Sequence, residues 1–570
     1  MVSPNLLKRS EEVQPVEINE KTKQLFQIIY SEQTKEKEQD DNTPRLKVST
    51  LISRLSFFYE KVRNAIDYDE EHLLRKNAIY RILRRQLVIE GALKEAAPRA
   101  IAEHLLVELI RGSYLPNNEL PETLVDDLGI KLAKYISLKS ALSARLSTNW
   151  SLGGDINETK DTIQRKNSLA TWIITLAACE IEEHLAPDKV EQSVVDNLFS
   201  ILSRKIQLPR DLPYEDDKEI QIYLSISRKY LKFDEDMLSF VLFKYYNADW
   251  LKINQSEDPS VLEKVADNLE NLKAMIDAQL KHPLARQLDR IVRRYSLYFY
   301  ILSETILSDP TKLYSDLQKG EKAFVAAIEK VCNQKYARTK MRLWRAAVRS
   351  IIYIFLTKSI FVFLIEVPAI RLFNEPLNPV SLAINVSFPA VLLFLIVFMT
   401  RKPGGDNTKM IIDGVKEIAL GDPAKVQPLV LRQPPRRTWL KDWLFNLVYA
   451  ACFLFSIYVI MRALALINFN WVSVIIFLFF LAFVSFFSVR TTKGLKELKV
   501  VERQENIFTL LLDLFYMPII MAGRWLSGKF SKINVFIFLF DFIIEAPFKV
   551  LVEIAEDWTK YIREWRENIE

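Results

Sequence analysis

Apolar residues are concentrated in four long runs in the C-terminal half of the chain, at 350–370, 379–398, 445–467 and 471–489. Each run is close to the roughly 20 residues that a helix needs to cross the hydrocarbon core of a bilayer. The pattern therefore predicts a transmembrane domain over residues 349–490 with four spanning helices.

The connectors within each pair of runs are short, at 371–378 and 468–470. A spanning helix cannot be skipped, so we expect each pair to form an antiparallel hairpin. Four spans in two hairpins place both ends of the domain on the same side of the membrane.

Positive charge indicates which side that is. The flanks 335–349, 401–442 and 490–499 are basic, whereas the two short connectors together hold one basic residue, Arg371. Loops rich in Lys and Arg remain in the cytoplasm. We therefore expect a plasma-membrane protein with a cytoplasmic loop at 401–442 and with both termini in the cytoplasm.

The C-terminal region, 491–570, contains two apolar segments that differ from the four spans. The segment 507–521 is short and is interrupted by Asp513 and Pro518. The segment 533–554 carries four charges at helical spacing: Asp541, Glu545, Lys549 and Glu553. If both segments spanned, their basic connector would face outside, against the usual charge bias. We expect amphipathic helices that lie at the membrane interface or pack against the bundle.

The region 47–348 is predicted to be a cytoplasmic all-α domain. Its apolar residues recur three and four positions apart, and the helix-start residues Asp188 and Asp309 stand next to prolines. Strand-like alternation bounded by glycine turns is missing, and the whole chain has only 13 glycines. The last helix should begin near Gly320 and run without a breaker into the first span.

The N-terminal residues 1–46 mix both charge signs and contain few large apolar side chains, so we predict a mostly disordered tail with at most a short helical segment. They show no secretory signal peptide. The three cysteines, Cys179, Cys332 and Cys452, are too far apart in sequence to suggest a disulfide framework.

Of the net charge of +6, the flanks 335–349 and 401–442 supply +6 and +4, so the remainder of the chain is about −4. This distribution is typical of membrane flanks and argues against a nucleic-acid partner. The partners that we expect are the lipid bilayer, a cytoplasmic protein or further copies of the chain.

Motifs for catalysis or for cofactor binding are not found. The sequence lacks GxxxxGK[ST], GxGxxG, HExxH and GxSxG. The four histidines, His72, His104, His184 and His282, have no metal-ligand spacing, and we interpret them as surface or capping residues. We therefore expect no catalytic residues, no metal site, no cofactor and no enzyme activity.

Three charged residues inside the predicted spans are the candidate functional residues: Lys358, Glu366 and Arg462. A charge at the bilayer centre costs about 2.5–3.5 kcal/mol on insertion scales, so each needs a partner or an escape to water. One arrangement is a salt bridge between Glu366 and Arg462 that joins the two hairpins. The other is snorkelling, with Lys358 reaching inward and the other two outward. Pro389, midway along the second span, is expected to kink it.

Two functions remain open on this sequence. A membrane-anchored interaction or scaffolding protein fits the large charged helical domain, the apolar spans and the lack of catalytic motifs. An oligomeric channel or transporter with a cytoplasmic regulatory domain fits the charges and the proline within the spans. The first is the favoured interpretation at this point.

Overall fold

The computed structural model of the chain describes residues 18–35, 44–48, 60, 70–90, 97–148, 156–252, 259–318, 320–421, 428–433, 439–501 and 507–532, with 554, 558, 561, 562 and 565. Nearly all its regular structure is helical, which confirms the all-α fold class. The chain divides into two compact units. The membrane unit comprises Met1–Asn19, Leu297–Gly421 and Pro434–Ala546, and the N-terminal unit comprises Glu20–Ser296, Asp422–Gln433 and Pro547–Glu570.

The helices of the N-terminal unit are α1 (Glu20–Lys35), α3 (Glu71–Arg84), α4 (Pro98–Arg111), α5 (Thr123–Thr148), α6 (Ile156–Leu185), α7 (Lys189–Lys205), α8 (Lys218–Lys229), α9 (Glu235–Tyr246), α10 (Pro259–Leu280) and the first part of α11 (Ala285–Ser308). Two short helical turns join them, the π-helix η1 (Arg85–Glu90) and the 3-10 helix η2 (Ala248–Lys252). The strands β1 (Ile206–Gln207) and β2 (Leu429–Val430) form one short parallel pair.

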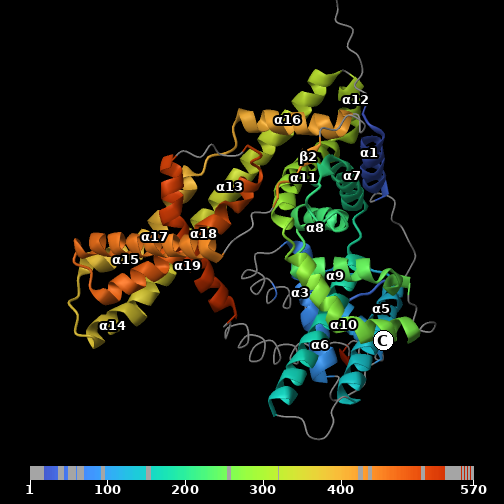
Figure 1. Cartoon of the computed structure of the whole chain (residues 1–570), viewed down its shortest axis with the longest axis horizontal. Helices are drawn as coiled ribbons and strands as arrows, with labels where there is room; N and C mark the ends of the chain where they lie inside the picture. The colour runs from blue at the N-terminus through green and yellow to red at the C-terminus, as the bar shows by residue number, and fades with distance from the viewer. Residues whose placement is uncertain are drawn as a thin grey trace, which may run out of the picture. The chain divides into compact units, whose positions relative to one another are not determined.

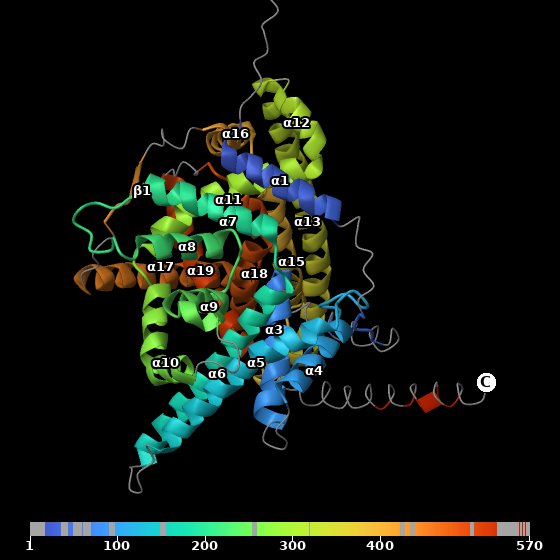
Figure 2. The same cartoon turned by 90° about the vertical axis from the view of Figure 1, so that its right-hand side faces the viewer.

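The main core of this unit lies among α3, α4, α5, α6, α9 and α10, which lie together in Figures 1 and 2. Leu105 and Leu109 on α4 are four residues apart, and both are fully buried, as are Leu128 and Leu132 on α5. This spacing puts each pair on one helix face, so α4 and α5 pack through apolar stripes. The predicted helix start at Asp188 is confirmed, because its side chain accepts a hydrogen bond from the N–H of Glu191 at 2.9 Å.

The prediction of a mostly disordered tail over residues 1–46 is wrong for residues 20–35, which form α1. Leu25 and Ile29 are one helical turn apart, and both are fully buried. They lie on the face of α1 that packs against α7, beside which α1 runs in Figure 2. An isolated helix with so few apolar residues would be unstable in water, but the packing of its apolar face against α7 stabilises α1.

The membrane unit contains the second part of α11, α12 (Pro310–Gln318), α13 (Glu321–Phe361), the π-helix η3 (Val362–Glu366), α14 (Val367–Leu372), α15 (Pro379–Met399), α16 (Gly405–Leu420), α17 (Trp439–Ala465), α18 (Trp471–Glu497) and α19 (Ile507–Lys532). Within the described residues, four helices are long and apolar enough to cross a membrane: Glu321–Leu372, α15, α17 and α18. They coincide with the four predicted spans.

The predicted continuity of the last soluble helix with the first span is confirmed. Gly320 precedes α13 with a φ of 102°, a left-handed conformation that glycine adopts readily. From Glu321 the helix then runs through α13, η3 and α14 to Leu372. A movement of its first half would therefore be transmitted along a helix into the bundle.

The two hairpin connectors lie at the same end of the bundle, as two antiparallel hairpins require. Asn378 donates hydrogen bonds to the carbonyls of Ile467 and Asn468, each at 3.3 Å. Asn470 donates in turn to the carbonyl of Pro376 at 3.3 Å. The side-chain amides therefore tie the first connector to the second.

At the other end, Asn407 joins the three basic flanks. Its Nδ2 donates to the hydroxyl of Tyr336 and to the carbonyl of Leu498, both at 2.9 Å, and its Oδ1 accepts from the N–H of Val500 at 2.7 Å. Asn407 is itself buried. The three flanks that the charge pattern predicts on one side of the membrane thus meet at one residue.

The C-terminal helix α19 packs against α17 and α18, with which it is drawn in Figure 1. Ser456, midway along α17, donates to the carbonyl of Phe515 at 3.3 Å, and Gly523 lies against the carbonyl of Ala482 in the middle of α18. The expected packing of this segment against the bundle is therefore observed for α19. The second expected amphipathic segment, 533–554, lies outside the described residues apart from residue 554.

Candidate functional site

Glu366 is fully buried inside the membrane unit, where three helices meet. It ends η3, and its Oε1 accepts hydrogen bonds from Asn385 on α15 at 2.6 Å and from Ser473 on α18 at 2.7 Å. All three side chains are 0% exposed. Two neutral donors thus hold one carboxylate oxygen at a fixed position.

The other carboxylate oxygen faces a buried cation. Oε2 of Glu366 lies 3.8 Å from Nζ of Lys358, close enough for an ion pair but too far for a direct hydrogen bond. Nζ of Lys358 lies over the ring of Phe480, 3.8 Å from its centroid, and 5.3 Å from that of Phe361. Lys358 is therefore held by one carboxylate and by the negative faces of aromatic rings.

The π-helix η3 explains how two residues eight apart come to face each other. In a regular α-helix eight residues turn by 800°, which leaves their side chains about 80° apart. A π-turn absorbs one extra residue, so the effective rotation is that of seven residues, about 20° short of two full turns. Glu366 also leans toward the N-terminus of the helix, and hence toward Lys358.

Pro368 is the local cause of this π-turn. It has no N–H for the carbonyl four residues earlier, and its ring would clash with that carbonyl in a regular helix. In the structure the N–H of Val367 instead reaches the carbonyl of Val362, a π-type bond immediately before the proline. The sequence thus encodes the phase shift that pairs Lys358 with Glu366.

The buried polar side chains of α15 and α18 are all neutral among the described residues. They are buried and lie at helical spacing: Ser381 and Asn385 on α15, and Ser473, Ser485, Ser488 and Thr492 on α18. Pro389 lies one turn beyond Asn385, so the carbonyl of Asn385 lacks its usual helical donor.

The structure corrects both arrangements that were open for the charged residues. Glu366 pairs with Lys358 and not with Arg462, whose residue is exposed on α17. Lys358 does not snorkel inward, because it is 0% exposed and points into the bundle. Both errors follow from the π-turn, which changes the face on which Glu366 lies. Arg462 lies near the end of α17 and is exposed, and its snorkelling to an interface stays a prediction.

Sequence reasoning missed Asn385, Ser473 and Pro368. Asn385 and Ser473 are uncharged, so the cost of placing a charge in the bilayer did not single them out as candidates. Pro368, two residues after Glu366, was the signal that could have revealed the altered helix phase.

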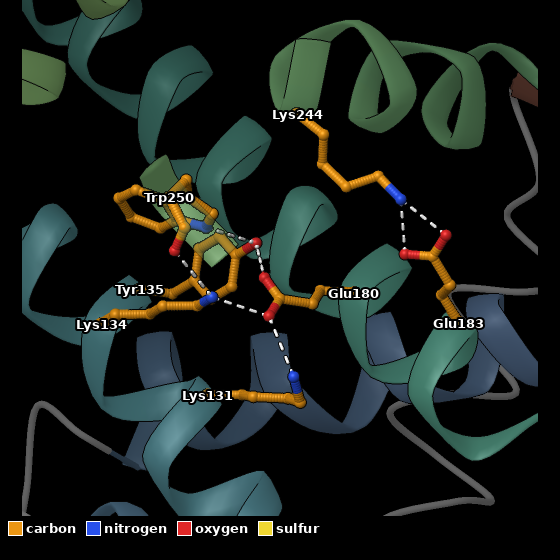
Figure 3. Close-up of polar contacts among 7 residues, drawn as sticks. All are labelled: Lys131, Lys134, Tyr135, Glu180, Glu183, Lys244 and Trp250. Atoms are coloured by element: carbon orange, nitrogen blue, oxygen red, sulfur yellow. Dashed lines mark hydrogen bonds and ion pairs between the residues drawn. The ribbon is translucent and has the colours of Figure 1, made fainter. Parts of the chain in front are cut away.

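A second buried charge cluster lies in the N-terminal unit, around Glu180 on α6 (Figure 3). Glu180 accepts hydrogen bonds from Nζ of Lys134 at 2.7 Å, from the hydroxyl of Tyr135 at 2.5 Å and from Nζ of Lys131 at 3.4 Å. The ring N–H of Trp250 donates to Tyr135 at 3.2 Å. Glu180 is 3% exposed, so this is a saturated network inside the core.

The pKa of Glu180 reflects this environment. Burial raises it, but the charge of Lys134 and the hydrogen bonds from Lys134 and Tyr135 outweigh burial, so that the pKa lies below its usual value. Three residues later on α6, Glu183 pairs with Lys244 at 2.6 Å near the surface (Figure 3). In the network around Glu180 the buried carboxylate has two cationic neighbours and a hydroxyl donor, so its charge is fully partnered within the core.

A third buried cation, Lys76 on α3, bridges Asp234 and Asp236 at the start of α9. Burial lowers the pKa of Lys76, but the two carboxylates outweigh burial and raise it. Within the described ranges, no three His, Cys, Asp or Glu side chains gather as a metal ion would require. In the membrane unit, by contrast, Nζ of Lys358 and Oε2 of Glu366 have no hydrogen-bond partner among the described residues.

Comparison of the chain with models of protein families, with curated proteins and with solved structures finds no match.

Proposed function

We propose that this chain is a membrane protein that carries ions across the bilayer, with the Lys358–Glu366 pair as its ion-handling site and the N-terminal unit as a regulatory domain. The observation that carries the proposal is one buried pair of opposite charges held between α13, α15 and α18. Ionisable residues inside membrane bundles mark ion pathways and proton relays.

The geometry of the pair supports a function beyond stability. Replacing a buried ion pair by apolar side chains of similar volume is often neutral or stabilising, so such a pair is weak evidence of a structural role. Among the described protein atoms, Nζ of Lys358, Oε2 of Glu366 and Oδ1 of Asn385 have no hydrogen-bond partner. Buried polar atoms in folded proteins usually have a partner, and here two of the three atoms belong to opposite charges that face each other.

We further propose that the membrane is the plasma membrane and that both termini lie in the cytoplasm. The support is the charge of the three flanks that meet at Asn407. A reporter inserted after Asn468 should then map outside and one after Gly404 inside. The opposite pattern would invert the topology.

The transport proposal is tested by reconstituting the full chain in planar bilayers and recording ionic current. We expect the wild type to pass current and Glu366→Gln to reduce it to the level of protein-free membranes, with unchanged gel filtration and circular dichroism. Arg462→Gln is the matched control, because it removes an exposed charge from a span outside the pair. A silent wild type, or a fully active Glu366→Gln variant, would contradict the proposal.

A second candidate is a membrane-anchored interaction protein, favoured by an open groove of about 520 Å³ between α6, α9 and α10. Glu235, Asp236 and Asp277 line it with one cation, Lys273. The acidic excess suits a basic segment of a cytoplasmic partner. This candidate predicts a stoichiometric partner that cross-links to the groove and is lost on Asp277→Lys, a change at an exposed lining residue, with no current in the wild type.

A further inference from the structure

We infer that the ion handled at the Lys358–Glu366 pair is the proton and that Oε2 of Glu366 is the atom that binds it. This inference rests on the proposed transport function and specifies its substrate.

The ligands around the site do not suit a metal cation. Oε1 of Glu366 already accepts two hydrogen bonds, so that among Glu366, Asn385 and Ser473 the buried oxygens without a donor are Oε2 of Glu366 and Oδ1 of Asn385. Ca²⁺ takes about six to eight oxygen ligands and Mg²⁺ about six. Nζ of Lys358, 3.8 Å from Oε2, would repel any such ion.

An anion is equally poorly served. Lys358 is the one buried cation at the site, and the carboxylate of Glu366 already faces its Nζ. A bound anion would lie beside that carboxylate in a medium of low dielectric, where like charges repel strongly. A proton needs one lone pair and no coordination shell, and Oε2 supplies it.

The step balances in atoms and charge. A proton carried by water forms an O–H bond at Oε2, and the water molecule that delivered it returns to bulk. Lys358 keeps its protons throughout, so the pair changes from net neutral to +1. Release to water on the other side breaks the same O–H bond and restores the carboxylate.

Protonation would also loosen the pair. Oε1 can keep its bonds from Asn385 and Ser473, because a carboxylic acid still accepts through its carbonyl oxygen. Lys358 would lose the charge that holds it in the bundle, and its long side chain could then reach an interface. Proton binding is thereby coupled to a movement on the first span.

No other charged or titratable group within the described spans competes for control of this proton. η3 packs against α13, α14 and α18, and α13 packs against α15. On α13 the group that faces Glu366 is Lys358. On α14 the charged residue is Arg371, which is exposed. Both α15 and the membrane part of α18, residues 471–489, lack Asp, Glu, Lys, Arg, His, Cys and Tyr.

The experiment uses the full chain, first in planar bilayers with a proton gradient and then in nanodiscs for infrared spectroscopy. We expect the reversal potential of the wild-type current to follow the proton gradient and to ignore gradients of Na⁺, K⁺ and Cl⁻. The infrared spectrum should show a protonated carboxyl band that grows as the pH falls. Glu366→Gln should lose this band, and the control Glu375→Gln, in the hairpin connector, should keep it.

Each result has one meaning. A current whose reversal potential follows Na⁺, K⁺ or Cl⁻ overturns the proton inference and leaves the transport proposal standing. A wild type without current overturns the transport proposal and, with it, this inference. Should Glu366→Gln fail to fold, Glu366→Asp serves instead, because a moved carboxyl should shift the band. A band unchanged in Glu366→Asp would exclude Glu366 as the proton site.

Discussion

Nζ of Lys358 lies 3.8 Å from Oε2 of Glu366, although the two residues are eight apart on what the sequence presents as a single helix. The π-turn η3 between them corrects the helix phase, and Pro368 accounts for the turn. π-turns of this kind occur frequently at functional sites. The site therefore depends on backbone geometry as much as on the two charges.

Replacing Pro368 should separate the pair. Pro368→Ala restores an N–H at position 368, so a regular α-helix becomes possible and Glu366 would turn away from Lys358 by about 100°, the rotation of one residue. We expect the current to fall to that of Glu366→Gln while thermal stability is kept or raised. Pro379→Ala is the control, because a proline in the first helical turn gives up no helical bond. Wild-type current in Pro368→Ala would refute the role of the π-turn.

Two ion pairs on α6 should differ in their contribution to stability. Lys134→Met leaves the carboxylate of Glu180 buried without its main partner, which typically costs about 3–5 kcal/mol. Lys244→Met removes the partner of Glu183 near the surface, where such pairs are worth about 0.2–1 kcal/mol. Denaturant unfolding of the full chain, followed by tryptophan fluorescence, measures both. Equal losses in the two variants would contradict the burial argument.

The lowered pKa of Glu180 gives stability a definite pH dependence. In the unfolded chain this carboxyl has its ordinary pKa and binds a proton more tightly than in the folded state. Stability from this residue is therefore complete above the ordinary carboxyl range and is lost as the pH falls toward the lowered pKa. Melting temperatures across that acidic range should fall less steeply for Glu180→Gln than for the wild type, with Glu183→Gln as the control. Parallel curves for wild type and Glu180→Gln would rule this out.

Gly414 should be intolerant of any side chain. A Cβ at this position on α16 would lie 2.3 Å from the ring of Tyr298 on α11. Gly414→Ala gains about 1 kcal/mol in helix propensity but should lose about 1–3 kcal/mol by overpacking, so we expect a lower melting temperature. Gly405→Ala, on the same helix with nothing within 4 Å of the new Cβ, should lie within about 0.5 kcal/mol of the wild type. A stabilised Gly414→Ala would show that Tyr298 moves freely.

Features that depend on local pattern could be predicted from the sequence. Four spans, two hairpins, the all-α class and the helix running on from Gly320 follow from the length, polarity and spacing of neighbouring residues. Lys358 and Glu366 could be identified from the sequence because a charged residue within a long apolar run is unusual. Asn407, which joins the three flanks, could not be identified in this way, because nothing in the sequence distinguishes it from the other polar residues of its flank.

Tertiary structure alone decided which neutral side chains hold Glu366, that α1 folds, and where α19 packs. Each depends on a surface supplied by a distant part of the chain: α15 and α18 for Glu366, α7 for α1, and Ala482 for Gly523 on α19. A π-turn shifts the helix by one residue and so rotates the following side chains by about 100°. The spacing of apolar residues within a single span does not reveal such a rotation. The sequence by itself therefore determined which helices are long and apolar enough to cross a membrane, and packing determined which of their polar side chains meet.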